Sequence, residues 1–201
     1  MTGRALGAGL VLGASALLAC GQARPDGAMA RAARSQENLA ARLEDRAMKA
    51  EILANLMEDR AVGGAKVTPH VYIGHAFLVG SVRTPAQRDA AIADAWKVQG
   101  VRSVEAYLPE EPRAKRSASR AASDLQLKRE LRGKLSLDPV LTTRVDLEVI
   151  DGHAVLLGVV PSQQAVQSAG TIAQGMGSIT GVTNFLLVPE EGYERVRPGL
   201  M

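Results

Sequence analysis

The sequence predicts an α+β fold made of two tandem small domains. Residues 74–82 return 78 residues later as residues 152–160, and the two copies share their Gly, His, Ala, Leu, Gly and final Val positions. The order helix, strand, strand, helix, strand surrounds each copy, as expected when one supersecondary unit is used twice. Aromatic residues make up only 3% of the 201 residues. Units of about 70 residues are near the lower size limit at which a domain supports its own core. We therefore expect the two units to pack against each other or against a partner.

The first domain is expected over residues 36–108. A helix is predicted from near Ser35 to Gly63-Gly64, and the next segment, 67–73, alternates like a strand whose Pro69 places it at a sheet edge. A returning strand follows over 76–82. Thr84 and Pro85 then open a second helix, which Gly100 ends, and a third strand spans 101–108. The apolar stripe of the first helix consists of Leu39, Leu43, Ala47, Ile52, Leu53, Leu56 and Met57.

The second domain, residues 121–188, repeats this order. A helix over 121–135 carries leucines at four-residue spacing, and alternation over 145–149 predicts a half-buried strand. Asp151-Gly152 is typical of a tight hairpin turn. A strand over 154–160, a helix from Ser162 to about Gln174 and a strand over 182–188 complete the unit. Because a helix links the second strand to the third, that pair is predicted to be parallel. We expect each domain to have a three-stranded mixed sheet with two helices on one face.

The ends of the chain and its linker have distinct compositions. Residues 1–19 carry one positive charge and a short apolar run, as in a secretory signal. Residues 20–35 are predicted to be a flexible tether, 109–120 a basic linker and 189–201 a polar tail. The one cysteine, Cys20, has no internal disulfide partner, so it pairs outside the chain or is modified. Leu17-Leu18-Ala19-Cys20 resembles a bacterial lipobox, which implies a lipid anchor on Cys20. An ordinary signal peptide with a chance cysteine is the alternative.

The repeated unit resembles the BON domain. The likeness rests on the Gly-x-Ala-x-Leu-x-Gly-x-Val pattern, followed by a helix and a Gly-Val step into the last strand. It implies that four glycines shape turns: Gly74, Gly80, Gly152 and Gly158. With a lipobox, the resemblance implies an envelope lipoprotein of the periplasm that binds anionic phospholipid. Gly21 after Cys20 favours the outer over the inner membrane.

A basic segment offers a site for lipid headgroups. Eight basic residues lie between Arg113 and Lys134, against only Asp124 and Glu130. Long basic side chains can lie along apolar surface with their charge at a headgroup. The predicted phospholipid-binding residues are Lys128, Arg129, Arg132 and Lys134. A solvated helix face beside a basic linker is the alternative interpretation.

The central strands carry apolar residues on both faces, although the helices are expected to cover only one. A continuous apolar patch usually marks an interface. Our hypothesis is that the two sheets, or two protomers, pack through these residues; cover by an unassigned segment is the alternative. The predicted interface residues are Phe77, Val79, Val155, Leu157 and Val159.

Several function classes are not expected. A net charge of +3 is small for a nucleic-acid binder. His75 and His153 occupy matching places after the hairpin turns, which suggests a repeated structural role, and His70 lacks metal-ligand spacing. No nucleophile motif is present, and neither cofactor, metal nor catalytic residues are predicted. Trp96 is expected to fill the core. The sequence therefore favours a non-enzyme, and the alternative to lipid binding is a scaffold that docks on another envelope protein through its apolar sheet face or self-associates.

Overall fold

The computed structural model describes residues 26–111, 118–139, 141 and 145–189, with side chains from Leu39 onward. All strands lie in one compact unit, residues 38–201. The first domain contains α1 (Asp26–Glu58), β1 (Lys66–Tyr72), β2 (His75–Ser81), α2 (Pro85–Trp96) and β3 (Ser103–Tyr107). The second contains α3 (Ala118–Leu135), β4 (Val145–Ile150), β5 (His153–Val159), α4 (Gln163–Gln174) and β6 (Gly181–Leu187). The predicted order of elements is confirmed.

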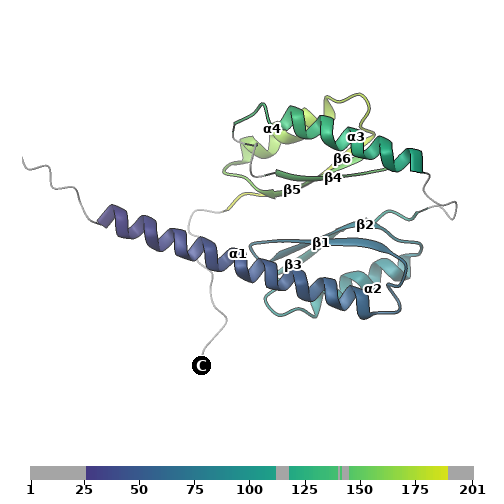
Figure 1. Cartoon of the computed structure of the whole chain (residues 1–201), viewed down its shortest axis with the longest axis horizontal. Coiled ribbons are helices and arrows are strands. Elements are labelled where there is room, and N and C mark those ends of the chain that lie inside the picture. The colour runs from purple at the N-terminus through teal and green to yellow at the C-terminus, as the bar shows by residue number, and fades with distance from the viewer. Residues whose placement is uncertain (1–25, 112–117, 140, 142–144, 190–201) are drawn as a thin grey trace, which may run out of the picture. The chain divides into compact units, whose positions relative to one another are not determined.

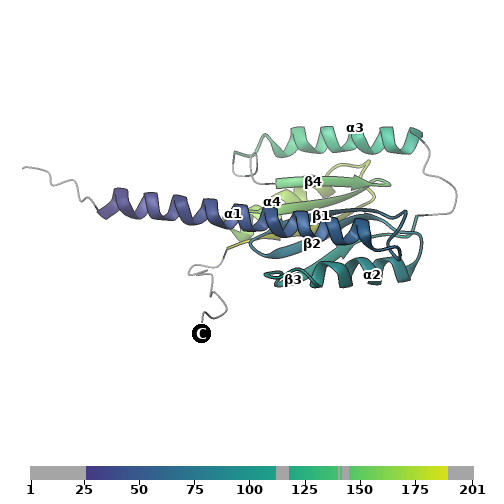
Figure 2. The same ribbon diagram turned by 60° about the horizontal axis from the view of Figure 1, so that its bottom comes forward.

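Each domain has its own three-stranded sheet, with strand orders β1-β2-β3 and β4-β5-β6. The hairpin strands pair antiparallel in both sheets, whereas β2 with β3 and β5 with β6 are parallel. In the first domain α1 and α2 cover one face of the sheet (Figure 1). In the second, α3 lies along β4, which Figure 2 shows from another side. The mixed sheets and one-sided helices agree with the predicted fold class.

The main core of each domain lies between its sheet and its helices. In the first domain, Met48, Ile52 and Leu56 of α1 pack with Ala91 and Ala95 of α2 on the sheet. In the second, the predicted leucine stripe of α3 meets small residues of α4 over β4, β5 and β6. That core includes Leu131, Leu135, Leu147, Leu156, Ala165, Ala169 and Ala173, with Leu127 at its margin. Alanine on α2 and α4 allows these helices to lie close to the sheets.

The first helix begins earlier than the sequence analysis expected. It starts at Asp26 rather than near Ser35, so the second part of the expected tether is helical. Residues 27–34 are mostly alanine and arginine, which have high intrinsic helix propensity even without an apolar period. Lack of periodicity was therefore a poor guide to flexibility here.

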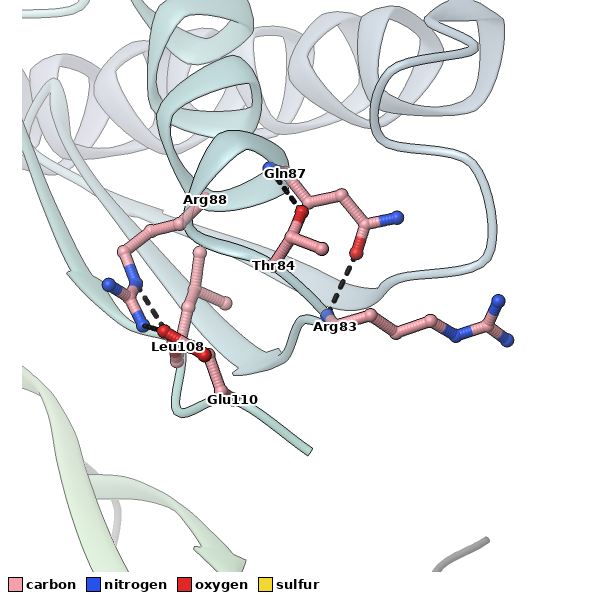
Figure 3. Close-up of polar contacts among 6 residues, drawn as sticks. All are labelled: Arg83, Thr84, Gln87, Arg88, Leu108 and Glu110. Atoms are coloured by element: carbon pink, nitrogen blue, oxygen red, sulfur yellow. Dashed lines mark hydrogen bonds and ion pairs between the residues drawn. The ribbon is translucent and has the colours of Figure 1, made fainter. Parts of the chain in front are cut away.

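The start of α2 follows its predicted capping chemistry. The Thr84 hydroxyl accepts a hydrogen bond from the Gln87 amide at 3.2 Å, and Pro85 occupies the first turn. The Gln87 side chain reaches back to the Arg83 amide at 2.8 Å, one residue before the cap (Figure 3). Arg88 donates to the Leu108 carbonyl at 3.1 Å and lies 3.6 Å from Glu110. These contacts tie α2 to the end of β3.

The predicted linker begins as part of the first sheet. The Val82 amide donates to the Pro109 carbonyl at 3.1 Å, and the Glu111 amide donates to the Val82 carbonyl at 2.7 Å. Lys66 of the edge strand lies 3.6 Å from Glu111. Residues 109–111 therefore extend the pairing of β2. The basic part of the linker, with Arg113, Lys115 and Arg116, lies outside the described residues.

Two of the four predicted turn glycines lie in turns. Gly74 and Gly152 each occupy the second place of a two-residue hairpin loop with positive φ. Gly80 and Gly158 instead lie inside β2 and β5, which corrects their prediction as turn residues. A Cβ on Gly80 would stand 1.7 Å from the Lys66 carbonyl oxygen, so close approach of the neighbouring strand requires glycine there.

Candidate functional site

The four predicted lipid-contacting cations lie on α3, but the structure divides them. Arg129, Arg132 and Lys134 are exposed, whereas Lys128 is half-buried. The Lys128 ammonium donates to both carboxylate oxygens of Glu148 on β4, at 2.9 and 2.8 Å. This ion pair joins the helix to the edge of its sheet. Lys128 is therefore engaged in holding α3, and its charge is partly neutralised.

Arg129 and Arg132 lie on the outward side of α3. Neither forms an ion pair with another residue in the described part of the chain. Leu125, one turn before Arg129, is 47% exposed on the same side. An exposed leucine beside these two guanidinium groups is suited to contact with a membrane, which offers both anionic headgroups and apolar chains. Leu125 was not predicted as a site residue, because it lies outside the leucine stripe that faces the core.

Lys134 lies apart from the two arginines, at an open depression of about 700 Å³ between the end of α3 and α4. Leu137 and Ile172 supply its apolar lining, and Asp138 its acidic side. The Ser168 hydroxyl donates to Asp138 at 3.1 Å, which fixes the loop after α3 against α4. The predicted four-residue site is thus an outward pair, one engaged lysine and one lysine at a separate depression.

A pair of aspartates that the sequence analysis did not single out organises both hairpins. Asp45 on α1 accepts hydrogen bonds from the amides of Ile73 and Gly74, at 2.9 and 3.0 Å. Asp124 on α3 accepts from Asp151 and Gly152, at 3.0 and 2.9 Å. Each carboxylate binds the two amides of a turn, so each first helix is fastened to its hairpin. The signal was an aspartate in both helices at nearly the same distance before the turn glycine.

Burial raises the pKa of Asp45, while the two turn amides act in the opposite direction by stabilising its charged form. The arrangement is that of a backbone anion cradle occupied by the protein's own side chain. It stabilises the fold and leaves the turn amides unavailable to an external anion.

The sheet faces that the helices leave open are buried against each other. One apolar cluster combines Phe77 and Val79 of β2 with Val155 and Leu157 of β5, together with Ile150. Tyr72, Tyr107, Phe185 and Leu187 pack around it. Of the five predicted interface residues, four belong to this cluster, whereas Val159 is half-buried and lies outside it. The apolar face needed by the scaffold hypothesis is therefore occupied within the chain.

Aromatic and polar contacts surround this domain contact. The rings of Phe77 and Phe185 stack with centroids 5.2 Å apart. Tyr107 stacks on His153 at 4.3 Å. The Tyr72 hydroxyl donates to Asp146 on β4 at 2.6 Å. Burial, and then this hydrogen bond to a carboxylate, raise the pKa of Tyr72, so the phenol stays protonated.

The three histidines have structural surroundings. The His75 ring is hydrogen-bonded to Ser103 at 2.7 Å, and the His153 ring to Thr183 at 2.9 Å, so each joins the middle strand to the third strand of its sheet. His70 lies on β1, and its buried Nε2 atom has no hydrogen-bond partner among the described residues. Burial lowers the pKa of all three rings. Among the described residues, no cluster of three His, Cys, Asp or Glu has the arrangement of a metal site.

Two further predictions meet different outcomes. Trp96, expected in the core, is 52% exposed at the end of α2, because Ala91 and Ala95 are the residues that face the sheet. Cys20 and the signal segment lie outside the described residues. Within the part of the chain that the structure covers, no helix is sufficiently long and apolar to span a bilayer.

Comparison with known proteins gives matches along most of the chain. The osmotically-inducible protein Y of Escherichia coli (strain K12) is 28% identical over 145 residues, which are 72% of each chain. Two solved structures of CdsD, a structural protein of the Chlamydia trachomatis type III secretion system, have TM-scores of 0.31. Their identities are 15% and 18%, and the matches cover 69% and 71% of this chain and 96% and 93% of theirs. The BON domain model matches twice, at residues 44–108 and 123–190. These two matches cover more than half of the sequence, so the chain belongs to the BON domain family.

Proposed function

We propose that the protein is a non-catalytic lipoprotein of the bacterial envelope, anchored through Cys20 and binding anionic phospholipid with the outer face of α3. The observation that carries the proposal is the exposed pair Arg129 and Arg132, which form no ion pair with the described residues and lie beside exposed Leu125. Lys128 is paired with Glu148 and Lys134 lies at a separate depression, so the two arginines carry the charge of this surface. The α3 surface combines charge with apolar area, whereas the described residues offer no comparable set of groups for catalysis.

The anchor and the α3 surface would have different tasks. Acyl chains on Cys20 would contribute roughly 0.8 kcal/mol for each buried methylene, enough for stable attachment when two or three chains are present. Each basic residue near an anionic surface adds only about 1 kcal/mol. The cations are therefore suited to selecting a headgroup or orienting the domains. Loss of the α3 cations should leave the protein attached but change its lipid preference.

Vesicle flotation tests the α3 surface without the anchor. In the full chain with Cys20→Ala, we expect binding to vesicles that contain phosphatidylglycerol and little binding to phosphatidylcholine alone. Replacing Arg129 and Arg132 by Gln removes about 2 kcal/mol, so partitioning should fall about 30-fold. Arg60→Gln with Arg83→Gln is the matched control, because it removes the same charge from exposed positions of the first domain. Equal losses in both variants, or no preference for the anionic vesicle, would reject the proposal.

Attachment is tested separately. Radiolabelled palmitate should be incorporated into the unmodified protein and not into the Cys20→Ala variant, which should leave the membrane fraction. The name of the Escherichia coli relative refers to osmotic induction, and this supports an envelope role under osmotic stress. A deletion strain is accordingly expected to grow more slowly after hyperosmotic shift, and the gene carrying Cys20→Ala should not restore growth.

A further inference from the structure

The exposed side of α1 carries a second apolar stripe, distinct from the one that packs on the sheet. Leu39, Leu43, Leu53 and Met57 are between 41% and 79% exposed. They account for most of the large apolar side chains exposed in the described part of the first domain. In the sequence they form one apparent stripe with Ile52 and Leu56, but the two sets face different ways, because Ile52 and Leu56 are buried.

The geometry of the helix places the exposed stripe away from both neighbours of α1. At about 100° per residue, Leu39, Leu43, Leu53 and Met57 fall within roughly 40° of one direction, and Ala50 shares it. Ile52, the centre of the buried stripe, lies about 140° from that direction. Asn55, which donates to the Asp94 carbonyl of α2 at 3.3 Å, lies about 160° from it. Neither the sheet nor α2 therefore covers the exposed stripe.

The spacing of this stripe alternates four and three residues, which is the heptad seam of a coiled coil. Its members are Leu39, Leu43, Arg46, Ala50, Leu53 and Met57. An amphipathic helix that only contacts its own sheet has no need of a second seam. The six residues of this seam give each helix six layers in which a partner helix can place side chains.

The seam is complementary to itself when two copies run antiparallel. In that register Leu39 lies opposite Met57 of the other copy, and Leu43 opposite Leu53. The charged Arg46 lies opposite the small Ala50, which leaves room for its long side chain. A parallel pair would instead bring two Arg46 side chains together in one layer, which is unfavourable. Two-fold pairing through one self-complementary surface is the commonest symmetry of homo-oligomers.

The residues beside the seam suit a second helix as its partner. Glu44, Glu51 and Glu58 are exposed about 100–140° from the seam on one side, whereas Arg42 and Lys49 lie about 60–80° from it on the other. Alanines 40, 47 and 54 lie between the seam and the glutamates, and small residues there allow two helices to approach closely. We infer that α1 is a self-association surface on which a second copy of this chain pairs its own α1 antiparallel.

Mixed cysteine cross-linking tests both the contact and its direction. In a Cys20→Ala background, full chains with Leu43→Cys and with Leu53→Cys are co-expressed with different tags and oxidised. We expect a cross-linked dimer that contains both tags, and little dimer from either variant alone. A parallel pair would give dimers from each variant alone. Leu125→Cys on α3, mixed with Leu53→Cys, is the control of similar exposure and should not cross-link.

Charge replacement gives an independent readout. Sedimentation of the full chain should show twice the monomer mass, and Leu43→Glu or Leu53→Glu should weaken association at least about tenfold. The double variant Leu43→Glu/Leu53→Lys should recover dimer, because each glutamate then faces a lysine. Circular dichroism should stay unchanged, since these side chains are exposed. A monomer at all concentrations, no recovery in the double variant, or loss of vesicle binding by Leu43→Glu at unchanged mass would overturn the inference.

Discussion

Asp45 and Asp124 perform the same task in the two domains: each carboxylate accepts hydrogen bonds from both amides of its hairpin turn. The two residues lie on different helices, α1 and α3, and their turns are 78 residues apart. This shared contact fixes the first helix of each unit to the same end of its sheet. It identifies a positioning element of the BON unit that lies outside the glycine and valine pattern.

We expect Asp45→Ala and Asp124→Ala each to lower the free energy of unfolding by about 2–4 kcal/mol. Each replacement leaves two amides without their charged acceptor, and hydrogen bonds to charged groups contribute more than neutral ones. Urea unfolding followed by circular dichroism measures the change. Asp89→Ala, at an exposed position on α2, is the control and should change stability by less than about 0.5 kcal/mol. Similar losses in all three variants would contradict this account.

The two hairpin turns predict a stabilising exchange. Ile73 and Asp151 both have positive φ, at 54° and 51°. That conformation is unfavourable for a β-branched residue and better tolerated by aspartate. Ile73→Asp should therefore raise the free energy of unfolding by about 1 kcal/mol, and Asp151→Ile should lower it by a similar amount. Thermal or urea unfolding checks both predictions. A loss of stability in Ile73→Asp would show that the contacts of the isoleucine side chain contribute more to stability than its positive φ costs.

Leu157→Asp should separate the two sheets. The leucine is completely buried in the cluster between them, and a charge there would lack a partner. We expect a loss of more than about 3 kcal/mol, with binding of a hydrophobic dye to the exposed faces. Val159→Asp is the control, since Val159 lies on the same strand but outside the cluster. If Leu157→Asp kept the stability of the unmodified protein, the domain contact described above would be wrong.

Acidification should destabilise the protein through its histidines. Burial lowers the pKa of His70, with Lys49 acting in the same direction and Glu148 and Asp146 opposing it. A ring whose pKa is below about 6.5 in the folded state binds protons more readily when unfolded. Stability is thus present above pH 6.5 and falls as the pH drops through that value toward the folded pKa. Urea unfolding at pH 7.5 and 5.5 should show this loss of unfolding free energy. His70→Phe should make the loss smaller, and the part that comes from His75 and His153 should remain.

Local chemistry predicted most of the fold because it repeats within the chain. Thr84 and Pro85 mark the start of α2, and alternation in β4 identifies its buried side, so element order and pairing follow from short-range patterns. The seam of α1 was not separable from its core stripe, because Leu53 and Ile52 are adjacent in sequence and only packing shows which one faces the sheet. Trp96 was misplaced for the same reason: on a helix rich in alanine, size alone does not determine which side is buried.

The candidate site was harder to predict from the sequence than the fold was. The basic composition of α3 located the surface, but the engagement of Lys128 depends on Glu148, which is distant in sequence and reaches the helix only because β4 is an edge strand. The contact of Asp124 with the amides of Asp151 and Gly152 likewise depends on tertiary structure, because only the folded hairpin brings both amides to the carboxylate. Composition thus identified the helix, whereas the assignment of each charge required tertiary contacts.

Because both faces of each sheet are buried, the two domains are not expected to be stable when they are expressed separately. A fragment ending in the linker would present Phe77 and Val79 to water, and its counterpart would present Val155 and Leu157. Isolated halves should precipitate or require detergent, and mixing them should restore solubility. The two domains repeat one fold, but each needs the other to keep one face of its sheet from water.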